Sequence, residues 1–371
     1  MDKKYLKPPV EVLYEKELAA LRENDAKNPK PENWNLSPKA IRTFILGSEK
    51  PLSLNGEKIE IKQKFYGDDS LIERCIITLA GNRGLMLVGE PGTAKTMLSE
   101  LLSAAISGSS VNTVQGTAGT TEDNIKYSWN YALLLAKGPV QEALVPAPLY
   151  TGMKDGIITR VEEITRCPSE MQDTLISIMS DKVLNIPELG EEGFIFAKPG
   201  FNIIATANTR DKGVNEMSSA LKRRFNFETV FPINSVAMES RIIEEQSGEL
   251  LKNLDTGIKV DDDVVNIIAT TFHELREGVS KEGAKIDSPS AVMSTAEAVS
   301  VYLQSALTGY FYNDGEVTMD NVVQNILGAV LKESRDDASK LKNYFNTVIK
   351  QRATKENGLW KGYYEARKWI K

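Results

Sequence analysis

The octapeptide Gly89–Thr96, with the sequence GEPGTAKT, constrains the fold of this chain more than any other segment. We interpret it as an instance of the phosphate-binding pattern G-x-x-x-x-G-K-[ST]. Gly89 and Gly92 allow the backbone to bend tightly, so that successive N–H groups face phosphate oxygens. The positive end of the helix that follows strengthens this attraction. The sequence therefore predicts a loop that binds the phosphates of a nucleotide.

Two side chains of this loop make ATP and Mg²⁺ the expected cofactors. Lys95 supplies a cation to the β- and γ-phosphates, and Thr96 offers a hydroxyl group to Mg²⁺. We expect nucleotide contacts along the whole loop and the residue after it, which comprise Gly89, Glu90, Pro91, Gly92, Thr93, Ala94, Lys95, Thr96 and Met97.

The segments around the loop predict an α/β fold. Leu85–Val88 is a short apolar run that suits a buried parallel strand, and Met97–Ile106 repeats apolar residues at helical spacing. Further predicted elements are strands over Ser110–Gln115, Gly156–Val161 and Asn202–Ala207, and a helix over Pro168–Lys182. Strands that alternate with helices predict a mainly parallel, doubly wound sheet. This is the context expected of a P-loop NTPase core.

The pattern changes to helices alone after about residue 232. The predicted helices are Glu239–Glu249, Val264–Glu277, Ser290–Leu307 and Val322–Leu331. We therefore expect four segments along the chain, which are a helical N-terminal extension with a proline-rich linker (1–60), a nucleotide-binding α/β domain (61–232), an all-α domain (233–331) and a basic, aromatic helical segment (332–371).

Polar side chains that follow two of the predicted strands extend the candidate site. Glu162 and Glu163 stand at the end of one strand, where both carboxylates can reach the cleft beyond its carboxyl edge. We expect Glu162 to contact the Mg²⁺ shell and Glu163 to polarise the attacking water. Asn208 ends the next strand and can hydrogen-bond the γ-phosphate or that water. Arg223 and Arg224, which follow each other later in the chain, suit the charge that develops on a transferring phosphoryl group.

Composition limits the class of protein further. The 371 residues carry a net charge of −6, which argues against a surface that is basic throughout. Cys75 and Cys167 stand at no paired or metal-type spacing, which favours a reducing compartment. No apolar run is long enough to span a membrane, and the N-terminus lacks the apolar segment of a secretory signal. A cytoplasmic location is the expectation.

Taken together, residues 65–330 resemble the AAA+ ATPases, and the order and spacing of the motifs resemble their MoxR branch. The resemblance implies a ring, commonly a hexamer, with ATP at the subunit boundaries, and an all-α lid after the core. It gives Lys95 and Thr96 the Walker A role, Glu162 and Glu163 the Walker B role, and Asn208 the sensor 1 role. It implies that Arg224, with Arg223 as the alternative, acts in trans on a neighbouring subunit.

The same resemblance implies two further elements and shows two departures. Gly116–Gly156 has the length of the inserted element of this branch, and Lys182–Gly200 is expected to be a β-hairpin. Glu162 stands where the family usually has aspartate, so the carboxylate is on a stem longer by one methylene. Ser290 stands where the lid usually carries an arginine, and no arginine follows until Arg335. Slow hydrolysis is therefore the expectation.

Three functions are compatible with these features. The favoured one is a ring-forming ATPase that remodels or assembles a protein client, with a von Willebrand factor A-type protein as a possible separate partner implied by the resemblance. The second is a nucleic-acid motor or loader, which the mixed charges of the insert Gly116–Gly156 disfavour because tracking phosphates requires a basic surface. The third is a scaffold gated by nucleotide that hydrolyses ATP slowly or not at all.

Overall fold

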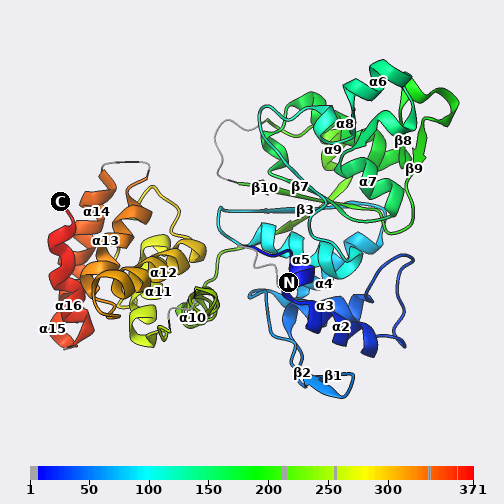
Figure 1. Cartoon of the computed structure of the whole chain (residues 1–371). Coiled ribbons are helices and arrows are strands. Elements are labelled where there is room, and N and C mark those ends of the chain that lie inside the picture. Colours follow the sequence, from blue (N-terminus) through cyan, green and yellow to red (C-terminus); the bar gives the residue numbers. More distant parts are fainter. Residues whose placement is uncertain (1–6, 210–214, 255–256, 333, 335, 357) are drawn as a thin grey trace. The chain divides into compact units, whose positions relative to one another are not determined.

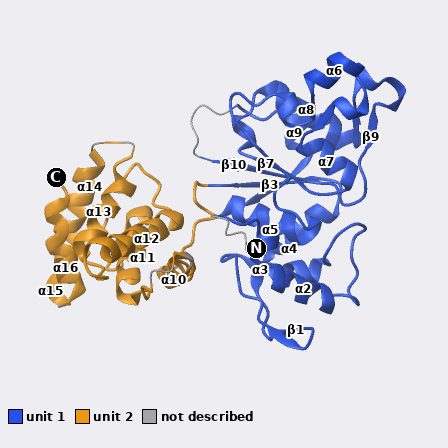
Figure 2. Ribbon diagram, viewed as in Figure 1, with its two compact units in different colours: residues 1–89, 94–230 blue, residues 90–93, 231–371 orange. Residues whose placement is uncertain are grey.

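The computed structural model describes residues 7–209, 215–254, 257–332, 334, 336–356 and 358–371. Arg335 lies outside the described residues. The chain divides into two compact units (Figure 2). Unit 1 comprises Met1–Gly89 and Ala94–Val230, and unit 2 comprises Glu90–Thr93 and Phe231–Lys371. Each unit is described separately below.

Unit 1 is built on a five-stranded parallel sheet (Figure 1). Its strand order is β11-β3-β10-β7-β4. The bounds are β3 Gly84–Gly89, β4 Thr113–Gln115, β7 Thr159–Glu162, β10 Ile203–Asn208 and β11 Phe225–Thr229. The predicted parallel α/β core is confirmed, and it includes one strand, β11, that was not predicted from the sequence.

Helices cover both faces of this sheet, as Figure 1 shows. Leu85 and Leu87 of β3 pack on one side, whereas Met86 between them packs on the other, because successive strand residues point to opposite faces. The helices on the first face include α4 (Asp69–Ala80) and α5 (Lys95–Ser107), and those on the second include α7 (Pro148–Asp155), α8 (Ser169–Asp181) and α9 (Ser219–Lys222). The sheet is thus buried on both sides, as its apolar strands require.

Residues 7–60 add to the apolar core on the first of these faces. They begin with two helices, α1 (Val10–Leu13) and α2 (Glu15–Asn24), which are separated at Tyr14. They are followed by α3 (Pro38–Leu46) and by a hairpin of β1 (Leu52–Leu54) and β2 (Glu57–Ile59). Buried side chains of α2 and α3 belong to the same apolar core as those of α5.

Two excursions from the sheet carry small antiparallel ladders. The first lies between β4 and β7 and contains η1 (Glu122–Asn124), β5 (Tyr127–Trp129), α6 (Tyr131–Lys137), η2 (Gln141–Ala143) and β6 (Leu144–Pro146). The second lies between α8 and β10, where β8 (Val183–Asn185) pairs with β9 (Phe194–Phe196). The hairpin expected within residues 182–200 is therefore present. Both excursions are drawn in green in Figure 1.

Unit 2 contains helices and, among its described residues, no strand longer than an isolated bridge. Its α-helices are α10 (Val236–Asn253), α11 (Asp262–Glu277), α12 (Thr295–Tyr312), α13 (Met319–Val330), α14 (Asp336–Tyr344), α15 (Lys350–Lys355) and α16 (Leu359–Glu365). A π-helical turn (Phe345–Ile349) joins α14 to α15, and a 3₁₀ turn (Ala366–Trp369) follows α16. The prediction of an all-α region after the nucleotide core is confirmed.

The C-terminal residues complete the core of unit 2. Tyr344, Phe345 and Tyr363 are fully buried in the same apolar cluster as α11 and α12. A buried ion pair also fixes this segment, because Arg352 contacts the carboxylate of Glu274, which is 1 % exposed. Among the described residues, no helix of either unit is long and apolar enough to cross a membrane.

Candidate functional site

The phosphate-binding loop connects the end of β3 to the start of α5. Gly92 has a φ of 76°, in the left-handed region that glycine tolerates without cost. Ala94 occupies the position of the second glycine of the pattern, so the segment departs from the pattern at this one residue. Ala94 nevertheless has a φ of 64°, which for a residue with a Cβ costs about 1–2 kcal/mol.

The lysine and the threonine of the pattern are the first two residues of α5. Lys95 is 6 % exposed, and its ammonium donates to the carbonyl oxygen of Gly89 at 3.1 Å. The hydroxyl of Thr96 donates to Oε2 of Glu162 at 2.9 Å. Within the loop, the hydroxyl of Thr93 donates to the carbonyl of Glu90 at 2.9 Å. The sheet therefore brings Thr96 and Glu162, which were both predicted to serve Mg²⁺, into direct contact.

Glu162 is the last residue of β7 and is only 4 % exposed. Its Oε1 accepts from Ser99 Oγ at 2.7 Å and from Arg160 Nη2 at 2.6 Å, and its Oε2 accepts from Thr206 Oγ1 at 2.8 Å as well as from Thr96. Burial alone raises the pKa of this carboxyl, but Arg160 and the hydroxyl donors outweigh burial and hold the pKa below its ordinary value. Glu162 is therefore an anion at neutral pH.

Glu163 differs from its neighbour in backbone and in surroundings. Its φ of 53° places it in the left-handed region, and its N–H donates to Thr206 Oγ1 at 3.0 Å. Its side chain is 32 % exposed and pairs with Arg166, with Oε2 at 2.6 Å from Nε. The left-handed residue ends the strand, so the two consecutive carboxylates do not share one environment.

Asn208 completes the edge of the sheet at which these groups meet. It is the last residue of β10, and the parallel register sets it opposite Gly89 of β3. The next residue, Thr209, donates its N–H to the carbonyl of Gly89 at 3.1 Å. The carboxyl ends of three adjacent strands thus carry the phosphate loop, the two glutamates and Asn208, which is where ligands bind in open α/β sheets.

The two arginines predicted to act on phosphate lie elsewhere in the same unit. Arg223 follows α9 and is exposed, and Arg224 directly precedes β11. Arg224 donates from Nε to Ser180 Oγ at 3.1 Å and from Nη1 to the carbonyl of Ala220 at 2.9 Å. The register of β11 with β3 starts at Gly84, so these arginines lie at the amino edge of the sheet. The structure does not bring them to the phosphate loop of their own chain.

Three residues around Glu162 were not foreseen from the sequence. They are Arg160, Ser99 and Thr206, and each contacts the carboxylate directly. Arg160 precedes Glu162 by two residues on one strand, which places the two side chains on the same face of the sheet. That spacing was a usable signal, whereas the contact with Thr206 depends on the pairing of β7 with β10.

The donor set is compatible with Mg²⁺. Thr96 and Glu162 offer a hydroxyl and a carboxylate oxygen, which are the hard ligands that Mg²⁺ prefers. Among the described residues, no group of three or more His, Cys, Asp or Glu side chains lies close enough to hold a metal ion. Mg²⁺ commonly relies on one or two protein oxygens together with phosphates and waters, so the site fits an ion that arrives with a nucleotide.

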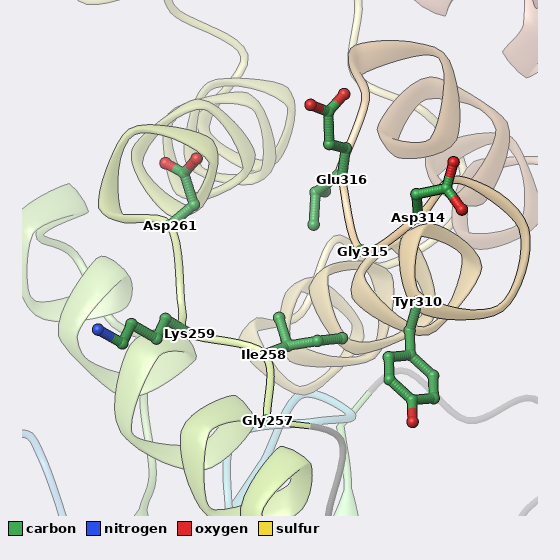
Figure 3. A pocket seen from close by; sticks show the side chains of 9 residues that line it. Gly257, Ile258, Lys259, Asp261, Tyr310, Asp314, Gly315 and Glu316 are labelled. Carbon is green, nitrogen blue, oxygen red and sulfur yellow. The ribbon is translucent and has the colours of Figure 1, made fainter.

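A separate pocket lies within unit 2 (Figure 3), with a volume of about 620 Å³. Its lining combines carboxylates, one lysine, one tyrosine and backbone, and comprises Gly257, Ile258, Lys259, Asp261, Tyr310, Asp314, Gly315, Glu316 and Val317. Residues predicted to hold nucleotide are not among these. The carboxylate of Asp261 is already used as the N-cap of α11, where it accepts from two backbone N–H groups.

Comparisons with known proteins agree with this arrangement. Residues 84–225 match the family described as an AAA domain of the dynein-related subfamily. Residues 237–371 match the family described as the C-terminal domain of YehL-like AAA+ ATPases. YehL of Escherichia coli (strain K12) is 49% identical over 362 residues, which cover 97% of this chain and 96% of that protein. SH1500 of Staphylococcus haemolyticus is 26% identical over 60% of this chain and 78% of its own length.

The chain therefore belongs to the AAA+ ATPases of the YehL-like family. The resemblance to the AAA+ ATPases seen in the motifs is therefore confirmed. Among solved structures, NtrX from Brucella abortus in complex with ADP aligns with a TM-score of 0.48 and 12% identity, over 82% of this chain and 69% of that chain.

Proposed function

We propose that this protein binds and hydrolyses ATP at the carboxyl edge of β3, β7 and β10. The observation that carries the proposal is the convergence of Lys95, Thr96, Glu162 and Asn208 at the ends of three adjacent strands. This convergence supplies a cation for phosphates, oxygen ligands for Mg²⁺ and a polar amide at one place, which is the set of groups that phosphoryl transfer requires.

Each residue of this chain has a distinct role in the proposed reaction. The loop N–H groups and Lys95 bind the phosphates, and Thr96 and Glu162 hold Mg²⁺. When bound, Mg²⁺ neutralises charge on the phosphate oxygens. Glu163 orients and polarises the attacking water once its carboxylate leaves Arg166. Asn208 holds that water or the γ-phosphate.

The position of the arginines supports a ring. Arg223 and Arg224 lie at the amino edge of the sheet, so neither side chain can serve the phosphate loop at the carboxyl edge of its own sheet without a change of fold. A neighbouring copy can present either of them to ATP. We propose a homo-oligomeric ring, commonly a hexamer in proteins of this type, in which ATP lies at the subunit boundaries.

We further propose that the ring remodels or assembles a protein client, with a separate protein containing a von Willebrand factor A domain as one candidate partner. The two excursions of unit 1 support a protein client more than nucleic acid. Lys126 and Lys137 of the first excursion each pair with a glutamate, Glu122 and Glu142. These cations are therefore compensated within the chain and do not form the basic surface that tracks phosphates.

A mixing experiment tests the hydrolytic and trans roles together. Glu163→Gln and Arg224→Ala are each expected to abolish ATP turnover while binding a fluorescent ATP analogue with affinity close to that of the wild type. Equal mixtures of the two variants are expected to recover part of the turnover, because some boundaries combine an intact Glu163 with an intact Arg224. A second mixture, in which Arg223→Ala replaces Arg224→Ala, is measured in the same way. The arginine whose loss abolishes turnover alone, and whose variant recovers turnover when mixed with Glu163→Gln, is the one that acts in trans. No recovery with either arginine variant refutes the trans role.

A gated scaffold is the second candidate, and the pair between Glu163 and Arg166 favours it. In a scaffold that pair is permanent, and the wild type and Glu163→Gln turn over ATP at the same near-zero rate. Arg166→Ala separates the two functions, because freeing Glu163 raises turnover in an ATPase and leaves it unchanged in a scaffold. We favour the ATPase because Lys95, Thr96, Glu162 and Asn208 converge at one edge of the sheet.

A further inference from the structure

Arg160 is a buried cation in β7, the strand that ends with the candidate metal ligand Glu162. It is 3 % exposed, and it lies two residues before Glu162 on β7. A buried guanidinium is costly unless its donors are paired. Here Nε donates to Ser99 Oγ at 2.9 Å, Nη1 to the carbonyl of Ser110 at 2.6 Å and Nη2 to Glu162 Oε1 at 2.6 Å. All three nitrogens of the side chain are thus used.

The contacts of Arg160 decide which oxygen of Glu162 meets the phosphate loop. Arg160 and Ser99 occupy Oε1, which leaves Oε2 to Thr96 and Thr206. Without these contacts the side chain of a glutamate, with one more rotatable bond than that of an aspartate, can adopt other rotamers. The planar guanidinium of Arg160 holds the carboxylate of Glu162 and the backbone carbonyl of Ser110 in one geometry.

We propose that Arg160 is a positioning residue that fixes Glu162 so that its Oε2 serves the metal together with Thr96. The inference rests on the proposed function, because it assigns a role toward Mg²⁺·ATP. It also accounts for the glutamate at a position where aspartate is usual, because Arg160 and Ser99 hold the longer side chain through Oε1. Arg160 itself touches neither metal nor nucleotide in this role.

The support of Arg160 extends to the N-terminal segment. The carbonyl that accepts from its Nη1 belongs to Ser110, whose N–H donates to Glu11 Oε2 at 2.9 Å. The hydroxyl of Ser110 in turn accepts from the N–H of Val10 at 3.2 Å. Helix α1 therefore fixes the backbone that receives Arg160, and Arg160 fixes Glu162.

The test measures Mg²⁺-dependent nucleotide binding rather than turnover. A fluorescent ATP analogue is titrated onto the full chain in EDTA and at increasing Mg²⁺, for the wild type, Arg160→Met, Arg160→Lys and the control Arg42→Met. Arg42 is an exposed arginine that pairs with Glu73 outside the site. Loss of a group that orients a metal ligand typically weakens metal binding about 10–100-fold.

We expect Arg160→Met to raise the half-saturating Mg²⁺ concentration at least about tenfold, with binding in EDTA unchanged. Arg160→Lys should recover part of the loss, and Arg42→Met should match the wild type. If Arg160→Met lowers the thermal midpoint but keeps the wild-type Mg²⁺ response, Arg160 is structural only and the proposal falls. If Arg160→Met does not fold, a wild-type Mg²⁺ response in Arg160→Lys overturns the proposal, and a weakened response supports it.

Failure of the proposed function gives a different result. A wild type that binds Mg²⁺·ATP but does not hydrolyse it refutes the ATPase and leaves the role of Arg160 measurable. A wild type whose nucleotide binding does not respond to Mg²⁺ refutes the role of Arg160 directly.

Discussion

Thr206 joins the two glutamates of the candidate site through one hydroxyl group. This hydroxyl donates to Glu162 Oε2 at 2.8 Å and accepts from the N–H of Glu163 at 3.0 Å, and the residue is 2 % exposed. Thr206→Val removes the hydroxyl at nearly constant volume. The hydrogen bond to a carboxylate is worth about 1.5–3 kcal/mol, and an unpaired N–H costs about 1 kcal/mol or more. We expect a loss of about 3 kcal/mol in the free energy of unfolding.

Thr206→Ser is the matched control because it keeps the hydroxyl and removes only a methyl group, which costs about 1 kcal/mol. Urea denaturation followed by circular dichroism measures both variants, and ATP turnover is recorded in parallel. Turnover should fall in Thr206→Val, because the left-handed peptide of Glu163 loses its anchor, and should persist in Thr206→Ser. The reasoning is refuted if Thr206→Val is no less stable than Thr206→Ser, or if both retain the turnover of the wild type.

Three further perturbations test other features. Ala94→Gly should stabilise the chain by about 1 kcal/mol or less, because glycine relieves the left-handed φ but loses entropy; a loss of stability in urea contradicts this. Arg352→Met should cost about 3–5 kcal/mol because the buried carboxylate of Glu274 loses its cationic partner and keeps only the hydrogen bonds from Tyr344 and Lys281, and recovery in Arg352→Met/Glu274→Gln is the check. The Arg352 hydrogen bond lowers the pKa of Glu282 from 4.5 to about 2. The stability from that pair is therefore present above pH 4.5 and lost toward pH 2, and Glu282→Gln should lack this acid dependence in urea titrations.

The sequence predicted those parts of the fold that depend on local pattern. The apolar runs before Gly89 and Asn208 are strands, and the helix after the phosphate loop is α5. β11 was not predicted, although the alternation of apolar and polar residues in FNFET is typical of a half-buried strand at the edge of a sheet. The predicted helix from Ser290 begins instead at Thr295, because Ser294 and Glu297 form a capping box whose spacing is visible in the sequence.

The residues around Glu162 depend on contacts that no local pattern contains. Thr206 reaches Glu162 because β10 pairs with β7, and the sequence does not specify which strands are neighbours. Ser99 reaches it because α5 packs over the same strand. The different environments of the two glutamates follow from the left-handed φ of Glu163, a conformation that glutamate rarely adopts and that composition does not indicate.

The hydrogen bonds from Glu11 and Val10 to Ser110 bear on how this protein can be shortened. A fragment that starts at residue 61 includes every motif of the nucleotide site, yet it omits α1 and the buried residues of α2 and α3 that share a core with α5. Such a fragment loses the support behind Arg160 and exposes part of that core. Tags and truncations at the N-terminus should therefore be checked for Mg²⁺-dependent binding before any loss of activity is attributed to the site itself.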